Sequence, residues 1–182
     1  MLTFFIGVLS GFCLALPVGA VALMCINKTL QFGFKSGLAV GLGAAFADAF
    51  YALIAIYSLT TISNIFLQNQ EIMRIIGGLC LIFISIRMIF SGPVVIETKE
   101  VAYSKWPQDI ISGFVITISN PLTYIGFIAL LSYMHLTFKN FNSDLILNFS
   151  AGAFVGSMAW WLILVEFARF LKNKVNSTFI RR

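Results

Sequence analysis

The chain alternates long apolar segments with short polar ones. Five segments reach the length of about 20 apolar residues that a helix needs to cross a bilayer. They cover residues 2–27, 36–60, 72–91, 109–136 and 145–170. The pattern therefore predicts an all-α polytopic membrane protein with about five transmembrane helices, built as a single membrane domain over residues 1–182.

Basic residues gather on one side of the predicted bundle. Of the 12 Lys and Arg residues, all but Arg74 and Lys139 fall in or beside the 28–35 connector, the 92–108 loop and the C-terminal tail. Cytoplasmic loops are enriched in Lys and Arg. We therefore expect the 92–108 loop and the tail in the cytoplasm and the N-terminus outside.

Composition supports the membrane prediction and excludes several functions. The chain is 59% hydrophobic and 10% charged, whereas soluble domains carry about 25% charged residues. The net charge of +5 comes from residues that flank apolar spans, so it indicates lipid rather than nucleic acid as the partner. Cys13, Cys25 and Cys80 all lie within apolar spans, and an odd number of cysteines without a clustered motif predicts neither a disulfide framework nor a metal site.

Asp48 is the only charged residue between Ser36 and Leu59. A carboxylate at the centre of a bilayer costs roughly 2.5–3.5 kcal/mol, so an intramembrane acid is a functional-site hypothesis by default. Helical spacing places it on a face of small residues, which suits helix packing: Gly37, Gly41, Ala44, Ala45, Asp48, Ala52 and Ala55. The side chain then points into the bundle. Two interpretations stay open, a neutral acid in a helix–helix hydrogen bond and a group that binds a proton or cation.

Pro17 and Pro121 each fall inside a predicted span and are expected to break helices one and four. Freed backbone groups are tolerated in a membrane only where protein or water satisfies them, which favours a central cavity. Uncharged polar side chains surround the second break, and Tyr51 lies one turn beyond Asp48. Together with Asp48 they form the candidate substrate or proton site: Asp48, Tyr51, Asn120, Thr123 and Tyr124.

A faint internal repeat accompanies these breaks. Ser-Gly-Phe precedes each proline, at residues 10–12 and 112–114, and each following span carries a G-x-x-x-G, Gly37/Gly41 and Gly152/Gly156. Three spans separate the copies, so the second would be inverted in the membrane. Inverted repeats with broken helices are typical of secondary transporters. The prolines and glycines of these segments are predicted to break helices or to let helices pack closely: Pro17, Gly19, Gly33, Gly37, Gly41, Gly43, Pro121, Gly152 and Gly156.

The run from Pro17 to Tyr51, PVGAVALMCINKTLQFGFKSGLAVGLGAAFADAFY, resembles the lysine-exporter (LysE-type) family of bacterial translocators, as does Asn120-Pro121 in the fourth span. The resemblance implies export of amino acids or similar small metabolites, by proton antiport, across the bacterial inner membrane. Ala20 stands where the family usually has a second proline, so we expect a milder first break. The family normally has six helices, so the 3+3 repeat is expected to be incomplete, with a homo-oligomer as one source of the missing surface.

Other functions remain as alternatives to a secondary exporter. A non-transporting or degenerate membrane subunit fits an incomplete repeat. A heavy-metal cation exporter could use the three cysteines, although they are scattered. A thiol–disulfide electron carrier needs a cysteine in both broken helices, and residues 110–136 contain none. Asp48 has no second acid at comparable depth and the chain has no nucleotide-binding glycine motif, so we predict no enzyme and no cofactor.

Overall fold

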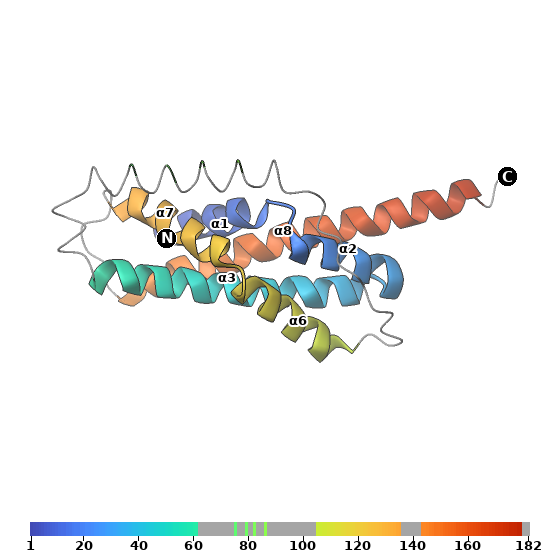
Figure 1. Ribbon diagram of the computed structural model, residues 1–182, viewed down its shortest axis with the longest axis horizontal. Helices are drawn as coiled ribbons and strands as arrows, with labels where there is room; N and C mark the ends of the chain where they lie inside the picture. Colours follow the sequence, from blue (N-terminus) through green and yellow to red (C-terminus); the bar gives the residue numbers. More distant parts are fainter. Residues whose placement is uncertain are drawn as a thin grey trace.

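The computed structural model describes the backbone of residues 1–61, 105–135 and 143–179 and of Ile75, Leu79, Ile82 and Ile86. Side chains are described for 1–57, 105–120, 122–131 and 144–172 and for the same four positions. The regular structure within these ranges is α-helical, in the order α1 (Leu2–Ala15), α2 (Ala20–Phe32), α3 (Phe34–Thr61), α6 (Trp106–Ile118), α7 (Pro121–His135) and α8 (Ser143–Phe179). Figure 1 shows these helices as an elongated bundle, with α8 continuing past its end.

The helices are suited to a membrane. Helices α3 and α8 are each long and apolar enough to cross a membrane, over Phe34–Tyr57 and Asp144–Lys172. The bent pairs α1 with α2 and α6 with α7 raise the number of candidate spans to as many as four, if each pair is one span. These correspond to the predicted spans 2–27, 36–60, 109–136 and 145–170. The prediction of a polytopic all-α membrane protein is confirmed. Most of the predicted span 72–91 and loop 92–108 lies outside the described residues.

Both predicted helix breaks are present at their prolines. The chain bends by 80° between α1 and α2, around Pro17, and by 63° between α6 and α7, where Pro121 is the first residue of α7. A proline has no N–H with which to continue the preceding helix. The first bend is the sharper of the two, although Ala20 stands where a milder break was expected. Gly19, which has non-helical backbone angles before α2, supplies the turn without a second proline.

Several helices extend past the bounds predicted for the spans. The 28–35 connector is helical except at Gly33, whose φ of 93° suits glycine and separates α2 from α3 in one residue. Helix α6 begins at Trp106, inside the predicted loop, because Pro107 in its first turn favours a helix start. Helix α8 continues to Phe179, past the predicted span 145–170, since none of the residues after 170 is a glycine or proline. Its stretch suited to a membrane, Asp144–Lys172, agrees with the predicted span.

Glycines make the closest helix contacts. Gly7 and Gly11 of α1 face α8, whose Gly152 and Gly156 face α1 in return. A Cβ on any of the four would overlap backbone atoms of the other helix. Small residues let helices approach closely in a bilayer, where packing and hydrogen bonds drive association instead of the hydrophobic effect. The α1–α8 contact is therefore tight and leaves little freedom for α1 to move.

The first half of each broken helix packs on the long helix that follows the other break. Helix α1 packs on α8, and α6 packs on α3. Gly11 meets Ala153 in the first contact, and Gly113 meets Val40 in the second. Each Ser-Gly-Phe copy thus lies beside the G-x-x-x-G segment of the other unit. Reciprocal packing of this kind is what two equivalent units would produce, and it agrees with the expected repeat.

Helix α3 is the central element, in contact with α2, α6, α7 and α8. All members of its small-residue face are buried: Gly37, Gly41, Ala44, Ala45, Asp48, Ala52 and Ala55. On the opposite face, Phe46 and Phe50 are 52% and 47% exposed, as side chains in contact with lipid would be. The fold therefore turns Asp48 into the bundle and bulky rings outward.

Candidate functional site

Asp48 lies near the middle of α3 and is only 4% exposed. Its Oδ2 accepts a hydrogen bond of 2.5 Å from Ser157 Oγ of α8. Within the described part of the chain it takes part in no ion pair, because the pairs present there join Lys28 to Asp109 and Arg169 to Glu166. Asp48 is thus an intramembrane acid whose described hydrogen-bond partner is a neutral hydroxyl.

Ser157 is itself oriented by a neighbour one turn further along α8. Trp161 Nε1 donates to Ser157 Oγ over 3.0 Å. Because the serine oxygen accepts from the indole, its own hydrogen is directed to the carboxyl group. Trp161 is 4% exposed and Ser157 is fully buried, so the chain Trp161–Ser157–Asp48 is shielded from water and fixes the carboxyl against α8.

The hydroxyl of Ser157 only partly compensates a charge on Asp48. Placing an aspartate at the bilayer centre costs about 2.5–3.5 kcal/mol, and a hydrogen bond to a charged group contributes about 1.5–3 kcal/mol. The remaining oxygen lone pairs can accept a proton or a cationic group. The arrangement suits reversible binding of a proton or cation at Asp48.

Tyr51 of α3 contacts the second helix break, between α6 and α7. Its hydroxyl donates to the carbonyl oxygen of Ile118, the last residue of α6. In an unbroken helix this carbonyl would accept from the N–H of Leu122, but that N–H instead donates to Asn120 Oδ1 over 3.2 Å. Tyr51 therefore satisfies a carbonyl freed by the break at Pro121. Polar groups left unpaired there would be costly in a membrane.

The other predicted residues of the site lie around the same break. Asn120 caps the start of α7, and the ring of Tyr124 lies 5.5 Å from the ring of Tyr51 at 37°. Thr123 is in the first turn of α7, where its N–H reaches the Asn120 carbonyl over 3.3 Å. The structure thus brings Tyr51, Asn120, Thr123 and Tyr124 together at the α3–α6–α7 junction, whereas the described hydrogen bond of Asp48 leads to α8.

The residues predicted for close packing or helix breaks are distributed over several contacts. Gly37 lies against Thr29 and the Cys25 carbonyl of α2, Gly41 against Trp161, and Gly43 against Ile110 of α6. Gly33 forms the turn between α2 and α3. Gly19 has open space around a Cβ position, so its place at the first break reflects backbone shape instead of crowding.

The sequence analysis did not identify Ser157 as the partner of Asp48, Trp161 as the residue that orients Ser157, or a second buried acid. Asp109 is 1% exposed and lies 2.8 Å from Lys28 Nζ. The signal for Ser157 was available, because it follows Gly156 on the packing face of an otherwise apolar span. Asp109 was treated as the edge of a span, which hid the fact that a buried acid and a buried base face each other there.

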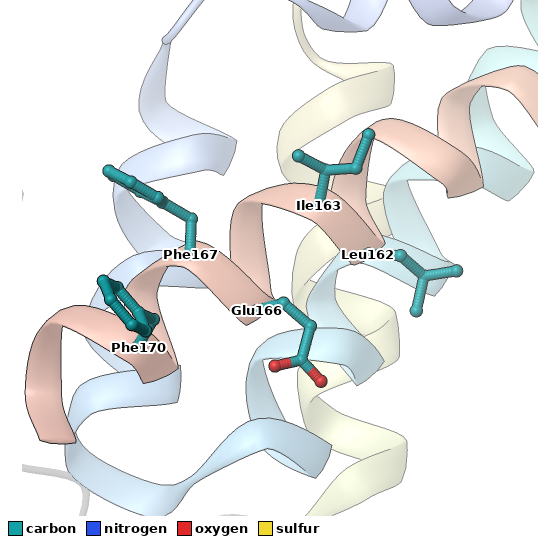
Figure 2. Close-up of a pocket in the computed structure, with 5 residues that line it drawn as sticks. All are labelled: Leu162, Ile163, Glu166, Phe167 and Phe170. Carbon is teal, nitrogen blue, oxygen red and sulfur yellow. The ribbon is translucent and has the colours of Figure 1, made fainter.

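A shallow hollow on the outer face of α8 is a separate feature. Its lining consists of Leu162, Ile163, Glu166, Phe167 and Phe170, all on α8. Figure 2 shows these side chains pointing away from the helix on its outer side. The hollow does not include Asp48. No group of three or more potential metal ligands occurs among the described residues.

Comparison with known proteins agrees with this architecture. The family model for "LysE type translocator" matches residues 12–182. A Bacillus subtilis (strain 168) protein named "Putative amino acid efflux protein YcgF" is 26% identical over 177 residues, covering 94% of this chain and 82% of that protein. "Uncharacterized membrane protein YahN" of Escherichia coli (strain K12) is 28% identical over 117 residues, 63% of this chain and 52% of that protein. No solved structure gives a significant match. The chain belongs to the LysE type translocator family.

Proposed function

We propose that the protein is a secondary active exporter of amino acids or similar small metabolites, coupled to protons. Family membership supports translocation, and the named efflux relative supports amino acids as cargo. The single observation that carries the coupling is the buried Asp48, which among the described residues is held by Ser157 and not by a cation.

Asp48 then alternates between two partners. With a proton bound, the neutral acid keeps its hydrogen bond to Ser157 at little cost in a low-dielectric site. When the ammonium group of a cargo molecule enters, it compensates the carboxylate and the proton leaves. One group thereby binds either a proton or a cationic group, which makes the two fluxes run in opposite directions. Tyr51, Asn120, Thr123 and Tyr124 supply uncharged hydrogen-bonding groups near the second break, where they position the uncharged part of the cargo.

The proposal includes a placement in the cell. The protein lies in the inner membrane of a bacterium with its N-terminus outside and its C-terminal tail in the cytoplasm, because its basic residues gather at one end. Lipid surrounds the exposed apolar side chains, and a homo-oligomer is a candidate assembly.

Efflux from loaded cells tests the function directly. Cells that express the chain are loaded with a panel of amino acids, and release is compared with cells that express Asp48→Asn. We expect faster release of at least one amino acid from the wild type alone. Equal release from cells with the wild-type chain and cells without it, across the whole panel, would count against an amino-acid exporter.

A further inference from the structure

A buried ion pair joins the two broken helices at the end of the bundle where α2 ends and α6 begins (Figure 1). Lys28 Nζ of α2 lies 2.8 Å from Asp109 Oδ1 of α6, and their side chains are 15% and 2% exposed. Asp109 is in the first turn of α6, where the partial positive charge of a helix N-terminus favours an acid. Removing one partner of a buried ion pair is strongly destabilising, so this contact holds α2 against α6 only while both side chains are present.

Other basic side chains close the same end of the bundle, which we call the basic end. Lys172 Nζ of α8 donates to the carbonyl of Leu30 in the last turn of α2 over 2.5 Å. Lys35 Nζ of α3 lies 5.3 Å from the centre of the Trp106 ring at the start of α6. These contacts tie α8 to α2 and α3 to α6, and the ion pair ties α2 to α6. Each of these contacts joins a basic side chain to a polar or aromatic group.

Helix α2 lies between two bends, whereas its neighbour α1 is fixed. The 80° bend around Pro17 precedes α2, and Gly33, with its positive φ, follows it. Helix α1 is locked to α8 by four glycines that meet backbone atoms, whereas α2 meets Gly37 of α3 mainly through the Thr29 side chain, and open space surrounds Gly19. Hinges are a few loop or element-terminal residues that absorb large changes in φ and ψ. Both ends of α2 therefore have the local structure that a tilting helix needs.

The core behind the ion pair leads to Asp48. Cys25 lies one turn before Lys28 on α2 and is fully buried. It packs in one cluster with Ala44, Ala45 and Trp161, and Trp161 donates to Ser157, the partner of Asp48. Cys25, one turn from the ion pair, thus packs in the same cluster as the tryptophan that is hydrogen-bonded to the partner of Asp48.

We propose that the Lys28–Asp109 ion pair is the closing contact of a gate at the basic end, opened when α2 tilts away from α6. The structure described here has this gate closed. Its meaning for transport depends on the exporter function proposed above, but the opening itself is a conformational event that can be measured without cargo.

Cys25 is a native reporter of that opening. In a chain with Cys13→Ser and Cys80→Ser, a membrane-impermeant maleimide added to inside-out vesicles from expressing cells should modify Cys25 slowly. Lys28→Met and Asp109→Asn should each raise the rate about tenfold or more, because either change removes the ion pair that joins α2 to α6. The exchange Lys28→Asp with Asp109→Lys should return the rate toward that of the parent. Lys35→Met is the matched control, since it removes a charge at the same end that contacts a ring instead of a buried acid, and it should leave the rate within about twofold.

A cross-link tests whether opening is required. Cysteines replace Lys28 and Asp109 in a chain whose native cysteines are serines, and a short bifunctional methanethiosulfonate joins them. Efflux of the amino acid identified in the panel should fall to the background of cells without the protein, and a reducing agent should restore it. The same reagent on either single cysteine should leave efflux unchanged.

The outcomes separate the gate from the exporter function. Equal maleimide rates in the parent, Lys28→Met and Asp109→Asn would overturn the gate, as would unchanged efflux after complete cross-linking. If the single variants fail to reach the membrane, the charge exchange and the cross-link decide the question, because each keeps a link between the two positions. Absence of efflux by the wild type would refute the exporter function, whereas the labelling result would still decide whether the pair closes this end.

Discussion

Two serines on α8 offer a matched pair of substitutions around the candidate site. Ser157→Ala removes a hydroxyl that donates to Asp48 and accepts from Trp161, so two buried groups lose a partner. Ser150→Ala removes a hydroxyl that has no hydrogen-bond partner among the described residues, at a site that is 6% exposed. The chemical change is the same in both variants and the helix is the same, but the expected effects are opposite.

Hydrogen bonds between membrane helices average about 0.6 kcal/mol and reach about 1.7 kcal/mol. With two such bonds lost, we expect Ser157→Ala to lower the free energy of unfolding by about 1–3 kcal/mol. Burial of a hydroxyl without a partner is unfavourable by about 1–3 kcal/mol in mutational data, so Ser150→Ala should be neutral or stabilising.

Reversible unfolding of the purified protein in mixed micelles with increasing SDS measures both variants, with tryptophan fluorescence as the signal. Trp161 in the buried chain reports on the packing of α8. A loss of stability in Ser150→Ala as large as that in Ser157→Ala would contradict the assigned hydrogen bonds, as would no change in Ser157→Ala.

Three further substitutions test single contacts. Tyr51→Phe keeps the ring but removes the hydroxyl that satisfies the Ile118 carbonyl at the second break, so stability in the same SDS titration should fall by about 1–2 kcal/mol. Gly33→Ala forces a side chain into a backbone region with φ of 93° and should cost about 1–3 kcal/mol, whereas Gly19→Ala, with open space around its Cβ, should be nearly neutral in the same measurement. Gly156→Ala places a Cβ against an α1 carbonyl and should lower the thermal midpoint and weaken α1–α8 packing, measured by cross-linking between cysteines on those helices.

The spans and their breaks could be predicted from sequence because each has a local cause. Apolar length predicts a crossing helix, and a proline without an N–H predicts a break. The inward direction of Asp48 also followed from local spacing, since small residues recur on its face of α3 and the Phe46 and Phe50 rings lie on the other.

The partners of the site residues could not be predicted in the same way. Ser157 lies 109 positions from Asp48, and a single serine in an apolar helix does not show which helix it faces. Tyr51 was predicted to belong to the same site as Asp48, and the partner of its hydroxyl is a carbonyl 67 positions away that the sequence did not indicate. The demand for that donor arises from the geometry of the second break, which becomes visible only when α3 and α6 are placed together.

Charges at span edges misled the prediction of boundaries for a related reason. Lys28 was assigned to a connector and Asp109 to the start of a span, as isolated charges near apolar segments usually are. In the structure each neutralises the other inside the bundle, so α2 and α6 can extend through both positions. An ion pair between residues distant in sequence thus allows charged residues inside helices, where isolated charges would mark the ends of spans.

The most direct test of the central claim is the response of transport to a pH gradient in proteoliposomes that contain wild-type protein or Asp48→Asn. Asparagine has nearly the shape of aspartate and can accept from Ser157, but it cannot bind and release a proton. We predict that a proton gradient drives the wild type to accumulate the amino acid identified by efflux, and that Asp48→Asn loses this response while folding normally in the SDS titration. Gradient-driven accumulation by Asp48→Asn at the wild-type rate would contradict the assignment of Asp48 as the coupling group.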